Sequence, residues 1–115
     1  MDEFKQQDIV WAKFPFSDMR DAKFRPALVV SNSIYNRNNS DVLVCAITST
    51  PDRKEYSIVI DSSNLSSGKL PIKSMVRSDK IIVIEKNLLE KSFARLNDKT
   101  FDLVVNGVKR LIERK

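Results

Sequence analysis

The sequence predicts a mainly β fold with α additions (α+β): a small, strongly bent antiparallel sheet or barrel with short helices and a C-terminal helix. Two observations predict this class. Short apolar runs rich in β-branched residues are separated by segments rich in Asn, Ser and charged residues. The clearest helical spacing of apolar residues comes only at the C-terminal end.

Length and composition narrow the class further. A chain of 115 residues suits one compact core, so we expect residues 1–115 to form a single domain, with residues 1–6 as a loose lead-in. Hydrophobic content of 42% and charged content of 30% are typical of a soluble globular protein. No apolar run approaches the roughly 20 residues that span a bilayer, so no membrane association is expected. The polar N-terminus and the single cysteine favour the cytoplasm.

The first strand is expected over residues 8–14, where apolar residues alternate imperfectly. It offers three side chains to a core: Ile9, Trp11 and Phe14. We interpret Trp11 as a core or dimer-interface aromatic in preference to a base-stacking one. Residues 15–23 are expected to form a loop, in which Phe16 and Met19 either pack down as a lid or offer stacking surface to bases.

Two further strands are expected in the first half of the chain. Residues 25–31 form one of them, and Pro26 belongs at its beginning or on an edge because it cannot donate to a ladder. Residues 32–41 are rich in Asn and Ser and form a turn that has room for one helical turn. Residues 42–48 are almost continuously apolar, which predicts a strand buried on both faces with Cys45 as an inert core residue.

The second half is expected to begin with a strand over 56–60, a long mobile loop over 61–69 and one or two strands over 70–84. The loop assignment follows from four serines, an asparagine and a glycine within it. Residues 87–92 are expected to form a short helix that Asn87 caps.

The C-terminal helix is predicted to begin at a cap supplied by Asn97 or Asp98. Apolar residues recur on one side of it: Phe101, Val104, Val105, Val108, Leu111 and Ile112. Gly107 lowers its intrinsic stability by about 1 kcal/mol relative to alanine. The basic residues at its end suit the helix dipole, and we prefer that role to RNA contact.

Arg25 and Thr48 form the strongest candidate site. Arg25 begins one apolar run and Thr48 ends the next, so antiparallel pairing of the two runs brings both side chains to one rim of the sheet. A rigid guanidinium fork and a hydroxyl together can hold a phosphate. The alternatives are a surface salt bridge for Arg25 and a turn-capping hydroxyl for Thr48.

Several chemistries are excluded by what the chain lacks. There is no histidine, which removes the usual ribonuclease acid and base and the usual ligand of catalytic zinc. Cys45 therefore has no histidine to activate it, which excludes a cysteine-hydrolase arrangement. The chain contains no P-loop, dinucleotide fingerprint or Ca²⁺ loop. A reaction without metal or cofactor, or no reaction, remains, and the net charge of +5 permits a polyanionic partner such as RNA.

Cleavage of RNA by its own 2′-hydroxyl group fits this inventory. The substrate brings the nucleophile, so the protein need only align it and stabilise the charge on the phosphorane. Asp79 can accept the 2′-hydroxyl proton, and Arg77, two residues earlier, shares its side of a strand. Alternatively, Arg77 and Asp79 merely pair with each other on an exposed strand.

Several short stretches of the chain resemble the sequence signatures of a known family. Residues 25–31 and 46–49 look like the RP-x-LV-x-S and P-I-T-S signatures of MazF/PemK-type toxins. Residues 7–11 resemble the G-D-I-V-W opening of the family. Residues 14–18 and 76–81 look like the F-P-F-T-D loop and the V-R-x-D-K-I run of its PemK-like branch. The resemblance covers roughly residues 7–112.

The resemblance implies an SH3-like barrel, a two-fold homodimer and a ribosome-independent, metal-independent endoribonuclease that cuts single-stranded RNA at specific sequences. Such enzymes leave a 2′,3′-cyclic phosphate and a 5′-hydroxyl. Four residues are implied to be catalytic: Arg25, Thr48, Arg77 and Asp79. The implied partner is a cognate acidic antitoxin of a type II system, whose disordered segment occupies the RNA groove.

Six further residues are candidates for RNA binding: Phe16, Ser17, Lys23, Asn32, Ser49 and Lys80. The chain also departs from the family pattern. Gln7 replaces the usual glycine, residues 15–23 lack the histidine of some PemK-like loops, and Ile82 and Val83 replace a common arginine and threonine. The last change bears on substrate preference and efficiency.

Two other functions remain open. The substituted run after Lys80 permits a non-catalytic RNA- or antitoxin-binding module of the same fold. A CcdB-like poison of DNA gyrase is less favoured, because CcdB-like chains end in Trp-Gly-Ile whereas this chain ends in Ile112-Glu113-Arg114-Lys115.

Overall fold

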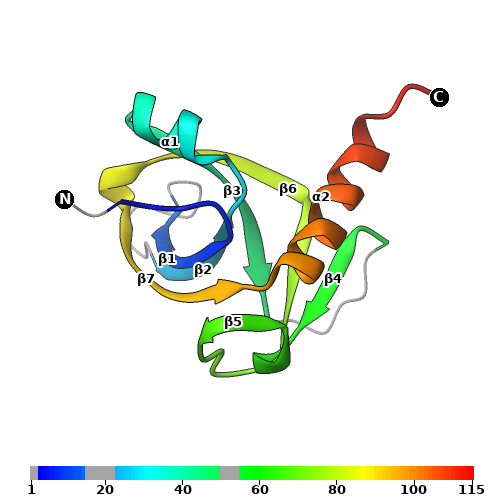
Figure 1. Cartoon of the computed structure of the whole chain (residues 1–115), viewed down its shortest axis with the longest axis horizontal. Helices are drawn as coiled ribbons and strands as arrows, with labels where there is room; N and C mark the ends of the chain where they lie inside the picture. The colour runs from blue at the N-terminus through cyan, green and yellow to red at the C-terminus, as the bar shows by residue number, and fades with distance from the viewer. Residues whose placement is uncertain (1–2, 15–22, 50–54) are drawn as a thin grey trace.

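The computed structural model describes residues 3–14, 23–49 and 55–115. Within these ranges, seven strands form one antiparallel sheet in the order β4-β6-β3-β2-β1-β7-β5 (Figure 1). The strands are β1 (Asp8–Lys13), β2 (Phe24–Val29), β3 (Asp41–Thr48), β4 (Ser57–Ile60), β5 (Leu65–Gly68), β6 (Ser74–Glu85) and β7 (Leu89–Leu96). The helical elements are α1 (Ser33–Asn38), α2 (Asp98–Ile112) and two 3₁₀ turns, η2 (Ser62–Asn64) and η3 (Lys86–Leu88).

The sheet curls into a half-barrel. Its two edge strands, β4 and β5, are joined only by residues 61–64, so the two edges lie close to each other although five strands separate them in the sheet. Figure 1 shows the central strands wrapped around a common interior, with α2 packed beside β6 and β4. The predicted α+β class, with a small bent antiparallel sheet and a C-terminal helix, is confirmed.

The central strands are buried on both faces. Neighbouring residues of β1 point to opposite sides, so Ile9 joins one core cluster and Val10 joins another. The first cluster includes Phe101 and Val104 of α2, and the second includes Phe4. In the strand predicted over residues 42–48, Val42 and Val44 join the second cluster, and Cys45 and Ile47 join the first.

The segment before β1 is packed against the sheet. Phe4 is 6% exposed, and its carbonyl accepts a hydrogen bond from Nδ2 of the buried Asn36 at 3.2 Å. The expectation of a loose lead-in over residues 1–6 is therefore wrong from Phe4 onward. Residues 1 and 2 lie outside the described ranges.

Gln7 keeps a backbone conformation that favours glycine. Its φ is 81°, in the left-handed region where a side chain is disfavoured. The side-chain amide Nε2 donates to the carbonyl of Leu96 and to Oδ1 of Asp98, both at 2.9 Å. These two bonds join the start of β1 to the start of α2, so the substituted residue preserves the turn and adds a connection.

Two predicted elements are wrong. Residues 62–68 form η2 and the edge strand β5, where we expected a loop over 61–69. Residues 89–96 form β7, which pairs with β1 from Asp8 opposite Arg95 onward, where we expected a helix over 87–92. In both places pairing with a distant strand overrides the local preference. The one or two strands expected over 70–84 are a single strand, β6.

The predicted C-terminal helix is confirmed. The side chain of Asn97 caps α2 by accepting from the backbone N–H of Thr100 at 2.8 Å. Phe101 and Val104 are buried, whereas Leu111 and Ile112 at the far end are exposed. No helix in the described part of the chain is both long and apolar enough to cross a membrane.

Cys45 is fully buried in β3, as predicted for a core residue. Burial, with a smaller contribution from the charge of Asp79, raises the pKa of its thiol from 9.0 to about 12. The thiol of the unfolded chain therefore ionises first as the pH rises. We expect the stability that this thiol contributes to be complete below about pH 9 and to be lost between about pH 9 and 12. Urea unfolding at pH 8 and 10 would show a larger loss in the natural protein than in Cys45→Ala.

Candidate active site

Arg25 and Thr48 meet at one rim of the sheet. β2 and β3 pair antiparallel with Ala27 opposite Ala46, so Arg25, two residues earlier, and Thr48, two residues later, fall at the same end of the pair. Both residues line the same two cavities. The structure thus brings together the two residues that the strand pattern predicted to be neighbours.

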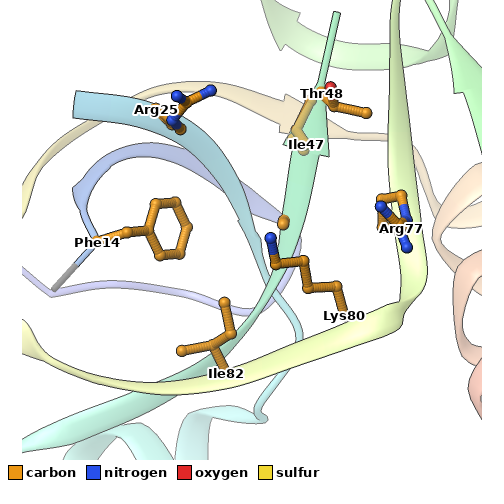
Figure 2. Close-up of a pocket in the computed structure, with 8 residues that line it drawn as sticks. Phe14, Arg25, Ile47, Thr48, Arg77, Lys80 and Ile82 are labelled. Carbon is orange, nitrogen blue, oxygen red and sulfur yellow. The ribbon is translucent and has the colours of Figure 1, made fainter. Parts of the chain in front are cut away.

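The first cavity has a volume of about 400 Å³ and a cationic lining. Its polar side chains are Arg25, Thr48, Arg77 and Lys80, and Figure 2 shows them around one space. Its apolar side chains are Phe14, Ala46, Ile47 and Ile82. Three positive charges that converge on a space with apolar walls suit a ligand that carries both phosphate and ring systems.

A bulge in β6 brings Arg77 and Lys80 to this cavity. Cys45 of β3 pairs with Ile81, and Ile47 pairs with Val76. Between these pairs, β3 has one residue, whereas β6 has the four residues 77–80. The additional residues cannot join the β3 ladder, so they arch away from it. A regular ladder would not aim both cations at one space.

Asp79 is held by Arg77. The guanidinium makes a two-pronged ion pair, with Nε 2.8 Å from Oδ1 and Nη2 2.9 Å from Oδ2. The two side chains are 25% and 26% exposed, so the pair is partly shielded from water. Arg77 lines the cavity, and Asp79 is its ion-pair partner. The pairing that the sequence left as an alternative is therefore present.

Helix α2 anchors the bulge of β6. Ser78 is fully buried, and its Oγ donates to the carbonyl of Val104 at 3.0 Å. Its backbone N–H donates to the carbonyl of Tyr56 at 2.9 Å. A Cβ at Gly107 would lie 2.7 Å from Oγ of Ser78, so α2 approaches this closely only because residue 107 is glycine. Sequence reasoning missed this anchor, and its only signal was a glycine on the apolar side of the helix.

The second cavity, of about 300 Å³, adjoins the first and shares Arg25, Ile47 and Thr48 with it. Trp11 lines it and is half-buried, with its ring stacked on that of Phe93 at a centroid distance of 4.8 Å. From the sequence we preferred a core or dimer-interface role for Trp11 to base stacking.

The six predicted RNA-binding residues are placed differently. Lys80 lines the first cavity and Ser49 the second, while Lys23 is exposed immediately before β2. Asn32 lies beyond the opposite end of β2, where its side chain caps α1 by accepting from the N–H of Tyr35. The structure does not bring Asn32 to the site, because its amide serves that cap. Phe16 and Ser17 lie outside the described residues.

The two residues that depart from the family pattern after Lys80 have different positions. Ile82 lines the first cavity, so it presents an apolar wall there. Val83 is 59% exposed and pairs with Leu43. In the described part of the chain, no group of three or more histidine, cysteine, aspartate or glutamate side chains is placed to hold a metal ion.

The chain matches one protein family over most of its length. Residues 5–112 match the family described as PemK-like, MazF-like toxin of type II toxin-antitoxin system. No curated protein sequence matches the chain.

Solved structures share its fold. One is a MazF from Deinococcus radiodurans, with a TM-score of 0.77 and 18% identity over 96% of this chain and 97% of that one. Another is an endoribonuclease from a Mycobacterial species in complex with its cognate antitoxin, with a TM-score of 0.76 and 18% identity over 100% and 98% of the two chains. A MazF toxin of Mycobacterium tuberculosis has a TM-score of 0.76 and 18% identity over 94% and 98%.

Proposed function

This chain belongs to the family of PemK-like, MazF-like toxins of type II toxin–antitoxin systems, and we propose that it is a sequence-specific endoribonuclease that cuts single-stranded RNA without a metal ion. The observation that carries the proposal is the convergence of Arg25, Thr48, Arg77 and Lys80 on one cavity. This arrangement suits a phosphodiester that gains negative charge during the reaction.

The proposed reaction uses the 2′-hydroxyl group of the RNA as nucleophile. O2′ attacks the adjacent phosphorus and the P–O5′ bond breaks, which leaves a 2′,3′-cyclic phosphate and a 5′-hydroxyl. Arg25 and the hydroxyl of Thr48 donate to the non-bridging oxygens, where charge accumulates in the transition state. Alignment and electrostatic stabilisation then supply most of the catalysis.

Asp79 and Arg77 are the proposed proton-handling pair. The Asp79 carboxylate, which Arg77 holds in a two-pronged ion pair, is the proposed acceptor of the 2′-hydroxyl proton. Arg77 stays protonated, orients that carboxylate and donates a hydrogen bond to the leaving O5′. Water supplies the proton that completes the 5′-hydroxyl, and the hydroxide that this leaves takes up the proton from Asp79, which restores the carboxylate.

The proposed assembly is a homodimer in the cytoplasm that a cognate acidic antitoxin neutralises. The dimer is supported by large apolar side chains that β6 and α2 leave exposed, which a second copy could cover: Ile81, Val83, Leu111 and Ile112. The antitoxin is proposed from the similar endoribonuclease that was solved with its cognate antitoxin, and from the charge of +5 that an acidic partner would complement. Light scattering of the purified protein would measure its mass, and a monomer at all concentrations would exclude the dimer.

The proposal is tested by incubating purified protein with a long single-stranded RNA in EDTA and by sequencing the cut ends. Discrete cuts with 5′-hydroxyl ends would support it and reveal the recognised sequence. Folded protein that binds RNA, with affinity that falls steeply as salt rises, but does not cut varied RNAs would instead be a binding module of the same fold.

Thr48→Val is expected to lower the cleavage rate about tenfold. The substitution keeps the branched shape but removes a hydroxyl donor worth about 1.5 kcal/mol to the charged phosphate. Single-turnover kinetics on one mapped site would measure the change. Thr48→Ser keeps the hydroxyl and should retain most of the activity; an equal loss in both variants would assign Thr48 a structural role.

A further inference from the structure

The second cavity lies beside the first, displaced along β3 toward the C-terminal end of that strand. Ala46 lines only the first cavity, Ile47 and Thr48 line both, and Ser49 lines only the second. A phosphate held by Arg25 and Thr48 would therefore sit at the junction of the two cavities. The groups attached to that phosphate on its two sides would extend into different surroundings.

The two cavities differ in chemistry. Arg77 and Lys80 line the first, whereas Arg25 is the only charged side chain among the described residues that line the second. The remaining walls of the second cavity are largely apolar and come from distant parts of the chain: Trp11, Pro26, Leu70, Pro71 and Ile72. Such walls give little to a phosphate but favour a flat, weakly hydrated ring.

Two of these walls are suited to receive a ring. Trp11 is fixed in orientation by its stack on Phe93, with an interplanar angle of 20°. Ile72 lines the same cavity while 59% exposed, so a large apolar side chain faces solvent beside the candidate phosphate position. A base that covered Ile72 would remove apolar surface from water on both partners.

We propose that the second cavity is a base-binding subsite, which holds the base of one of the two nucleotides that flank the phosphate at Arg25 and Thr48. The inference rests on the proposed function and adds a specificity determinant to it. Single-stranded RNA exposes unstacked bases that aromatic and apolar side chains can take up. Ser49, at the rim of the cavity, offers a hydroxyl to the edge of the base.

Trp11 makes the subsite directly measurable because it is the single tryptophan of the chain. The probe is an eight-nucleotide RNA that carries a mapped cut site, with a 2′-deoxy group that removes the nucleophile. Two further probes carry an abasic position immediately before or after the cut. We expect the intact RNA to change the fluorescence of Trp11, and one abasic RNA to lose this change and bind about tenfold more weakly.

A variant of the cavity wall sharpens the test. Ile72→Asp places a charge where the base would lie, at an exposed position where folding should be little affected. It should weaken binding of the intact RNA about as much as the abasic position does, and the two changes together should cost little more than either alone. Ile34→Asp, at an equally exposed isoleucine of α1, is the matched control and should bind like the natural protein.

The outcomes separate this inference from the proposed function. If the protein cuts RNA but binds both abasic probes as tightly as the intact probe, with the same fluorescence change, the enzyme stands and the subsite is overturned. The cavity would then suit an apolar side chain of a protein partner. If no RNA is cut at all, the proposed function fails in the cleavage assay itself, and the subsite fails with it.

Discussion

Arg25→Ala is expected to lower the rate of RNA cleavage by about 10²- to 10³-fold, the usual effect of removing one donor from a site that stabilises developing charge. Arg25 lines both cavities and lies at the rim where Thr48 ends β3. Its loss removes one of the two guanidinium forks of the first cavity, and the other, that of Arg77, is already held by Asp79. Single-turnover cleavage of a short RNA with one mapped site would measure it.

Two controls keep this prediction specific. Arg25 is exposed, so thermal unfolding of Arg25→Ala should match that of the natural protein to within about 0.5 kcal/mol. Arg37→Ala removes another exposed arginine, from α1, and should leave cleavage unchanged. Arg25→Lys keeps the charge but not the guanidinium fork, so its cleavage rate should lie between those of Arg25→Ala and the natural protein. Full activity in Arg25→Ala would remove this residue from the mechanism.

Gly107→Ala is expected to destabilise the protein by about 1–3 kcal/mol, although alanine favours helices more than glycine does. The new Cβ would lie 2.7 Å from Oγ and 2.9 Å from Cβ of Ser78, and both distances are shorter than a normal van der Waals contact. Ser78 is fully buried, so the strain can be relieved only by shifting α2 or the bulge of β6. Urea unfolding would measure the change in the free energy of unfolding.

A second substitution tests the cause. Ser78→Gly removes the side chain that the new Cβ would meet, so the double variant should recover part of the stability that Gly107→Ala loses. Asn106→Ala, at an exposed neighbouring helix position, should be neutral or slightly stabilising. Additive losses in the double variant would show that the contact with Ser78 is not the cause.

The site was predictable where it depended on strand ends. Arg25 and Thr48 are brought together by antiparallel register alone, and register follows from two apolar runs joined by a turn. The pairing of Arg77 with Asp79 follows equally from a spacing of two residues along a strand.

Other features depended on contacts far along the chain and were not predictable. The run from Val76 to Ile81 reads as an ordinary strand, and only its pairing with β3 reveals the bulge that aims Lys80 into the cavity. β7 contains residues that favour helices, such as Leu89, Glu90 and Lys91, and becomes a strand because β1 pairs with it. The second cavity draws on Trp11 and Ile72, whose proximity no local pattern indicates.

The pairing of β1 with β7 joins the first of the described strands to the last, and this constrains the order in which the molecule can assemble during synthesis. Asp8 must wait for Arg95 to leave the ribosome, and the bulge with Arg77 must wait for the carbonyl of Val104 that anchors Ser78. Pairings over such long stretches of chain form late and slowly. The nascent polypeptide therefore lacks an assembled cavity until Arg95 and Val104 have both left the ribosome.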